Sequence, residues 1–181
     1  MTAKMQPRAT RKHSVPRAKP SGKTRLPPHA AAVPRQDTDI YSFIDVFRAE
    51  PLARVRMIKA GLPADYLDQL ARRMKMPKER LLPTLGIAPA TVSRKVRQAL
   101  PLSSDDSERA LGMARLVGQV QAMVEESGDP EGFDAAQWLA QWMEEPLPSL
   151  GGARPSELMD TSEGQAMVSN ALARMQSGAY A

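Results

Sequence analysis

From residue 40 onward the hydrophobic residues recur every three or four positions, and no segment alternates convincingly between apolar and polar residues. This spacing places apolar side chains on one face of successive helices, so it predicts an all-α protein. The first predicted helix has Ile40, Phe43, Ile44 and Phe47 on one face, and Phe43 and Phe47 are predicted core residues. Pro51 ends this segment and starts the next helical pattern.

The segment Leu81–Gln98 contains two short helical patterns separated by Gly86. Leucines at 81, 82 and 85 precede the glycine, and Ile87, Val92 and Val96 follow it. Two helices joined by a tight glycine turn are typical of a helix-turn-helix, whose second helix enters the major groove of DNA.

The second of these helices is predicted to start at Pro89 and to be amphipathic. At about 100° per residue, Val92 and Val96 fall towards the core and Arg94 falls on the opposite side. Arginine can bond guanine bidentately, glutamine can bond adenine in the same way, and threonine can contact a thymine methyl or a phosphate. The predicted DNA-binding residues are Ala90, Thr91, Ser93, Arg94, Lys95, Arg97 and Gln98, with Arg94 and Arg97 as the main contacts. The alternative is a solvated face on an ordinary surface helix.

Another helix is predicted from Pro63, because proline fits the first helical position, where its missing N–H costs nothing. Its buried stripe comprises Tyr66, Leu67, Leu70, Ala71 and Met74. Three basic residues follow near its end, Arg72, Arg73 and Lys75. They either complement the helix dipole or reach DNA phosphates, and the sequence leaves both interpretations open.

After Pro101, Ser103 and Ser104 are predicted to cap a long helix whose single apolar face includes Leu111, Val117, Val120, Met123 and Val124. A turn at Leu150-Gly151-Gly152 is predicted to let helices approach closely. The last helix is predicted to bury Met167, Val168, Leu172 and Met175 and to end at Gly178.

The net charge of +5 is unevenly distributed along the 181 residues. Residues 1–36 carry +9, residues 37–98 carry +5 and residues 99–181 carry −9. The basic part is expected to attract nucleic acid through its phosphates, whereas the acidic part suggests a different partner. We predict a disordered basic arm over 1–39, a helix-turn-helix domain over 40–100 and a helical dimerisation and partner-binding domain over 101–181. The arm either follows DNA or merely aids solubility.

Composition argues against several other functions. The chain has no cysteine and only two histidines, so we expect no metal site, no cofactor and no catalytic residues. The chain contains no run of 18 apolar residues, so we expect no membrane span. The start of the sequence lacks the apolar segment of a secretory signal. A cytoplasmic protein that is not an enzyme is the expectation.

A set of short motifs in the C-terminal part carries a family resemblance. These are Trp138-Leu139, Pro146, Leu150-Gly151-Gly152, Pro155-Ser156-Glu157-Leu158, Thr161-Ser162-Glu163-Gly164 and Gly178-Ala179-Tyr180. Together they resemble the C-terminal toxin-binding domain of the Xre/MbcA/ParS antitoxins. The match covers about 45 residues, and the helix-turn-helix upstream extends it to about 120.

The resemblance implies an antitoxin whose partner is a RES-domain toxin that consumes NAD. Such an antitoxin neutralises the toxin by direct binding and represses the operon that they share. We expect a homodimer on operator DNA, because helix-turn-helix proteins usually contact two half-sites. The alternative is a stand-alone transcription regulator without a toxin partner.

The expected toxin-binding residues lie in two places. Trp138 and Trp142 are one helical turn apart, and we expect at least one of them in the core. We expect Trp142 to contact the toxin, because tryptophan dominates interface hot spots. At the end of the chain, Gly178, Ala179, Tyr180 and Ala181 follow the last helix. Tyr180 and the carboxylate of Ala181 are predicted to enter the active-site cleft of the toxin and exclude NAD; a frayed end without a role is the alternative.

Overall fold

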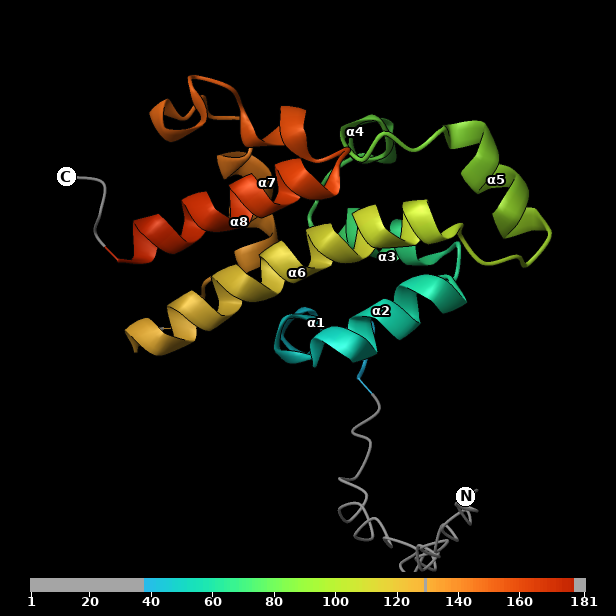
Figure 1. Cartoon of the computed structure of the whole chain (residues 1–181), viewed down its shortest axis with the longest axis horizontal. Coiled ribbons are helices and arrows are strands. Elements are labelled where there is room, and N and C mark those ends of the chain that lie inside the picture. The colour runs from blue at the N-terminus through green and yellow to red at the C-terminus, as the bar shows by residue number, and fades with distance from the viewer. Residues whose placement is uncertain (1–37, 129, 178–181) are drawn as a thin grey trace, which may run out of the picture. The chain divides into compact units, whose positions relative to one another are not determined.

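The computed structural model describes residues 38–128 and 130–177, and the structural statements below concern these residues. Within these ranges the backbone is helical and forms no strand, apart from an isolated bridge between Pro63 and Pro101. The helices shown in Figure 1 are α1 (Phe43–Arg48), α2 (Pro51–Ala60), α3 (Tyr66–Arg73), α4 (Lys78–Thr84), α5 (Pro89–Arg97), α6 (Ser104–Ser127), α7 (Ala135–Trp142) and α8 (Ser162–Gln176). Two short 3-10 helices, η1 (Pro148–Leu150) and η2 (Pro155–Leu158), connect α7 to α8. The prediction of an all-α fold is confirmed.

The long helix α6 lies at the centre, and α1, α2, α7 and α8 pack against it (Figure 1). Ser103 caps its start, because the Ser103 hydroxyl accepts a hydrogen bond from the backbone N–H of Asp106 at 3.2 Å. Half of its 24 residues are buried, many more than the single predicted apolar face contains. Gly118 allows α1 to approach closely, since a Cβ at this position would overlap the carbonyl of Phe43. A single helix therefore supports elements from both halves of the chain.

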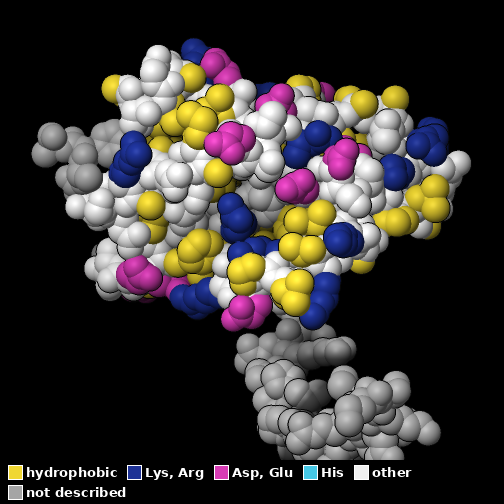
Figure 2. All heavy atoms as spheres, in the orientation of Figure 1, with side chains coloured by type: hydrophobic (Ala, Val, Ile, Leu, Met, Phe, Trp, Pro, Cys, Tyr) yellow, Lys and Arg dark blue, Asp and Glu magenta, His cyan; other side chains and the backbone are white. Residues whose placement is uncertain are grey.

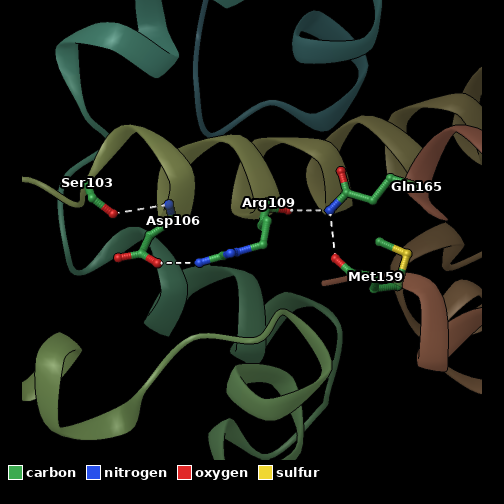
Figure 3. Close-up of polar contacts among 5 residues, drawn as sticks. All are labelled: Ser103, Asp106, Arg109, Met159 and Gln165. Carbon is green, nitrogen blue, oxygen red and sulfur yellow. Dashed lines mark hydrogen bonds and ion pairs between the residues drawn. The ribbon is translucent and has the colours of Figure 1, made fainter. Parts of the chain in front are cut away.

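A buried amide fastens the C-terminal helices to α6 (Figure 3). The side chain of Gln165, in the first turn of α8, is only 4% exposed. Its Nε2 donates to the carbonyl of Met159 at 2.9 Å and to the carbonyl of Arg109, within α6, at 3.1 Å. The side chain of Arg109 in turn forms an ion pair with Asp106 at 2.7 Å. This network holds the end of η2 and the start of α8 in place.

The predicted buried stripe of α3 is confirmed, as is the burial of the leucines at 81, 82 and 85. However, α3 begins at Tyr66 and not at Pro63 as predicted. The carbonyl of the preceding residue, Leu62, accepts a hydrogen bond from the N–H of Leu102 at 2.8 Å, which keeps this segment beside Pro101. Pro63 therefore lies in an extended segment, and its carbonyl accepts a bond from the N–H of Tyr66 at 3.0 Å.

Two predicted core residues are exposed. Val96, expected to face the core with Val92, is 42% exposed, whereas Val92 is the buried residue of α5. Met167 is also 42% exposed. It precedes the fully buried Val168 by one residue, which places its side chain about 100° away around α8.

The turn predicted at Leu150-Gly151-Gly152 is present, but for a different reason. Gly151 and Gly152 have φ of 70° and 87°, a conformation that favours glycine. A Cβ at either glycine would meet open space. The turn therefore requires glycine for its backbone conformation, and the predicted close approach of helices is wrong.

In the described part of the chain, no helix is long and apolar enough to cross a membrane.

Candidate interaction surfaces

Helices α4 and α5 form the helix-turn-helix that the sequence predicts. Gly86 lies in the turn with φ of 62°, and Leu85 and Ile87 on either side of it are buried. A Cβ at Gly86 would lie 3.0 Å from the Cβ of Asp160, which precedes α8. The turn is therefore packed closely against the C-terminal part of the chain as well as within its own motif.

The predicted DNA-binding residues occupy the exposed side of α5. Ala90, Ser93, Arg94, Arg97 and Gln98 are exposed, and Thr91 and Lys95 are partly exposed. Figure 2 shows Lys or Arg side chains beside hydrophobic ones at the end of the molecule where Figure 1 places α5. This side of α5 is open to a partner.

Two of these side chains already make contacts within the protein. Arg94 Nη1 donates to Gln98 Oε1 at 3.3 Å, which aligns a guanidinium and an amide on one side of α5. The ammonium of Lys95 donates to the carbonyl of Pro101 at 2.7 Å, near the end of the helix. Lys95 therefore has a structural role in the unbound protein, while Arg97 has no such bond among the described contacts.

Two of the three basic residues at the end of α3, Arg73 and Lys75, make contacts within the protein, which favours a structural role for these two. The guanidinium of Arg73 lies over the ring of Phe43, 3.9 Å from its centroid, and donates to the carbonyl of Tyr41. Lys75 Nζ lies 3.3 Å from a carboxylate oxygen of Asp134 and 2.6 Å from Gln137 Oε1. Arg72 is exposed.

Asp134 caps the start of α7 and joins this helix to the end of α3. Its carboxylate accepts a hydrogen bond from the backbone N–H of Gln137 at 3.0 Å. This hydrogen bond is the main cause that lowers the pKa of Asp134 below its ordinary value, and Lys75 adds to the effect. A second ion pair, between Arg80 of α4 and Glu144 at 2.8 Å, links the other end of α7 to the helix-turn-helix.

Three aromatic rings follow one another along α7. The rings of Trp138 and Trp142 are stacked, with centroids 5.8 Å apart and an interplanar angle of 13°. The ring of Phe133 lies 6.1 Å from that of Trp138. Both tryptophans pack against the core and are partly buried, where we expected at least one of them in the core.

Phe133 is a residue that the sequence analysis missed, and a local signal was present. A helix cap at Asp134 places Phe133 immediately before the cap and Trp138 at the fourth helical position. Apolar residues at these two positions commonly pack together as a hydrophobic staple.

The residues 178–181, predicted to enter the toxin, lie outside the described residues.

The described residues thus combine a helix-turn-helix with an acidic helical region that carries an exposed aromatic surface. Two family models match the chain: the antitoxin Xre-like helix-turn-helix domain over residues 53–115 and the antitoxin Xre/MbcA/ParS C-terminal toxin-binding domain over residues 121–178. The protein is therefore a two-module antitoxin, with one module of a DNA-binding type and one of a toxin-binding type. The chain belongs to the Xre/MbcA/ParS antitoxin family, as the sequence motifs suggested.

Three relatives place it more closely. The chain is 46% identical over 144 residues to the Prs ADP-ribosylating antitoxin of Sphingobium sp. strain YBL2. The aligned region covers 80% of this chain and 91% of the relative. It is 27% identical over 126 residues to the antitoxin Xre of Yersinia enterocolitica, covering 70% of this chain and 80% of the relative. It is 25% identical over 122 residues to the antitoxin Xre of Photorhabdus laumondii, covering 67% and 77%.

Proposed function

We propose that this antitoxin neutralises a cognate ADP-ribosylating toxin by direct binding and represses the operon that encodes both proteins. The observation that carries the proposal is the 46% identity to an antitoxin whose name links it to ADP-ribosylation of Prs, over 91% of that relative. ADP-ribosyl transfer consumes NAD, so the partner would be an NAD-consuming enzyme, of the RES-domain type that the family resemblance implies. The cytoplasm is the compartment where these partners would meet.

In this proposal, residues 101–181 dimerise and bind the toxin, with Trp142 as a contact and the segment 178–181 reaching its active-site cleft. The side chain of Tyr180 would occupy the space that NAD needs. Support comes from the position of α8, which leads directly to this segment and is fastened to α6 by Gln165. Deletion of residues 178–181 is expected to leave the melting temperature unchanged and to abolish inhibition of the toxin. A deletion variant that inhibits as tightly as the full chain would refute the active-site block.

DNA binding is assigned to residues 40–100, through Ala90, Thr91, Ser93, Arg94, Lys95, Arg97 and Gln98. The exposure of most of these side chains and the alignment of Arg94 with Gln98 support the assignment. A homodimer would present two copies of α5 to two half-sites of an operator.

The experiment that tests this proposal is co-expression of the chain with the product of the neighbouring gene, followed by purification on a tag carried by the chain alone. A stoichiometric complex that also shifts the operator fragment of the two genes is the expected result. Tight, sequence-specific DNA binding without any complex would instead indicate a stand-alone transcription regulator.

A further inference from the structure

Helix α7 presents three distinct sides. Its buried side consists of small or aliphatic residues: Ala135, Ala136, Leu139 and Ala140, followed by Met143 just beyond the helix. At about 100° per residue, Gln137, Gln141 and Glu144 fall on the opposite, polar side. Trp138 and Trp142 fall on the flank between the two, so packing of the helix against α6 does not by itself require them. This flank, together with Phe133, is called the aromatic ladder below.

The aromatic ladder concentrates aromatic residues that are scarce elsewhere in the chain. It contains both tryptophans and one of the three phenylalanines of the sequence. Phe133 is 40% exposed and the two tryptophans are partly exposed. The staple between Phe133 and Trp138 explains one ring contact by the start of the helix. It does not explain the second contact, in which Trp142 continues the stack one turn further on.

The rings of the ladder pack against one another in the unbound chain. The two indoles are stacked at 5.8 Å, and Phe133 packs against the first of them. Side chains that are fixed in advance lose little conformational entropy on association. Aromatic residues are enriched at protein interfaces, and tryptophan is among the residues that dominate their binding energy.

We propose that the aromatic ladder of Phe133, Trp138 and Trp142 is a docking surface for the toxin. The inference rests on the proposed function and extends its Trp142 contact to a surface of three aromatic rings. The occupant is assigned as the toxin because the ladder lies inside residues 121–178, which match the toxin-binding family model. The same residues contain ten acidic and two basic side chains.

The charges beside the ladder define the surface that it fits. Glu131 lies two residues before Phe133 and Glu145 three residues after Trp142, and both are exposed. Asp134 and Glu144 also lie near the rings but are already paired with Lys75 and Arg80. The toxin therefore offers an apolar patch with basic residues around it, and charge complementarity of this kind fixes the orientation of docking.

The test uses the full chain and the toxin encoded by the neighbouring gene, with the dissociation constant measured by calorimetry. Phe133→Ser removes an exposed ring, and Trp142→Met removes an indole while leaving an aliphatic side chain against the core. The matched control is Met167→Ser, because Met167 is 42% exposed on α8 in the same toxin-binding region. We expect each ladder variant to weaken binding by roughly tenfold or more and the control by less than about twofold. Melting temperature and operator binding of each variant report whether the fold is intact.

A second measurement uses the wild-type sequence, so it does not require that any substituted chain folds. Because both tryptophans lie in the ladder, a chain labelled with 5-fluorotryptophan gives fluorine resonances from the ladder alone, with the toxin unlabelled. Both resonances are expected to shift when a stoichiometric amount of toxin is added.

The outcomes separate the inference from the proposed function. A complex that forms with unshifted resonances, or ladder variants that bind like the control, overturns the ladder while the antitoxin function stands. Ladder variants that dissociate a homodimer but bind toxin normally also overturn it, since the surface would then join two copies of the chain. A wild-type chain that binds no toxin overturns both.

Discussion

Replacement of Gln165 by leucine tests how the toxin-binding helices are held on α6. The substitution keeps the approximate size of the side chain but removes the Nε2 group that donates to the carbonyls of Met159 and Arg109. Both the side chain and Met159 are buried, so water does not replace the lost donor easily.

The expected loss of stability follows from these two bonds. An unsatisfied buried carbonyl at Met159 costs about 1–3 kcal/mol, and the Arg109 carbonyl adds less because an N–H within α6 can still bond it. The sum is about 1–4 kcal/mol, which lowers the melting temperature by roughly 2–16 °C for a protein of this size. Gln165→Glu removes the same donor and brings a carboxylate close to two carbonyl oxygens, so it is expected to destabilise at least as much at neutral pH.

The assay is thermal unfolding by circular dichroism at pH 7 and a fixed protein concentration. Gln176→Leu is the matched control, because the Gln176 amide bonds the carboxylate of Glu126 at 2.7 Å in an exposed position. The control is expected to change the free energy of unfolding by less than about 0.5 kcal/mol. If Gln165→Leu melts within about 1 °C of the wild type, the buried amide does not hold α8 on α6.

Three further predictions concern separate parts of the molecule. Asp134→Ala removes the cap of α7 and is expected to cost about 0.5–2 kcal/mol at pH 7 in urea unfolding. Because the pKa of Asp134 is lowered in the folded protein, its carboxylate contributes stability above the unfolded-state pKa of about 4. The difference in stability between the wild type and Asp134→Ala should therefore shrink as the pH falls below that value. A difference that stays constant down to pH 2 would contradict this. Gly118→Ala forces a Cβ against the carbonyl of Phe43 and is expected to cost about 1–3 kcal/mol in the same assay, whereas unchanged stability would show that α1 can move away freely. Arg94→Ala and Arg97→Ala are each expected to weaken operator binding by about 1–3 kcal/mol in gel-shift titrations at fixed salt, and unchanged affinity of both would place the recognition surface elsewhere.

The parts of the fold that depend on local signals could be predicted from the sequence. The helical period of the leucines and the glycine at 86 specify the helix-turn-helix, and Ser103 and Thr161 cap α6 and α8 as their residue type favours. The stripe on α3 is buried as its spacing indicates. Each of these features needs only residues within a few positions of one another.

Features that depend on tertiary packing could not be predicted in this way. The exposure of Val96 depends on where α5 leaves the core, and the amide of Gln165 bonds a carbonyl that lies 56 residues away. Lys75 adopts a positive φ of 51°, an uncommon conformation for lysine, where it meets Asp134. Spacing showed that Trp138 and Trp142 share a side of α7, but only the three-dimensional structure shows that their rings stack.

In the proposed function, this chain neutralises an NAD-consuming toxin by binding it. The most direct measurement is the rate of NAD loss catalysed by the purified product of the neighbouring gene, titrated with the full antitoxin chain. The proposed function predicts that NAD loss falls in proportion to added chain and stops at a fixed stoichiometric ratio. A rate of NAD loss that stays constant at saturating concentrations of the chain would contradict it.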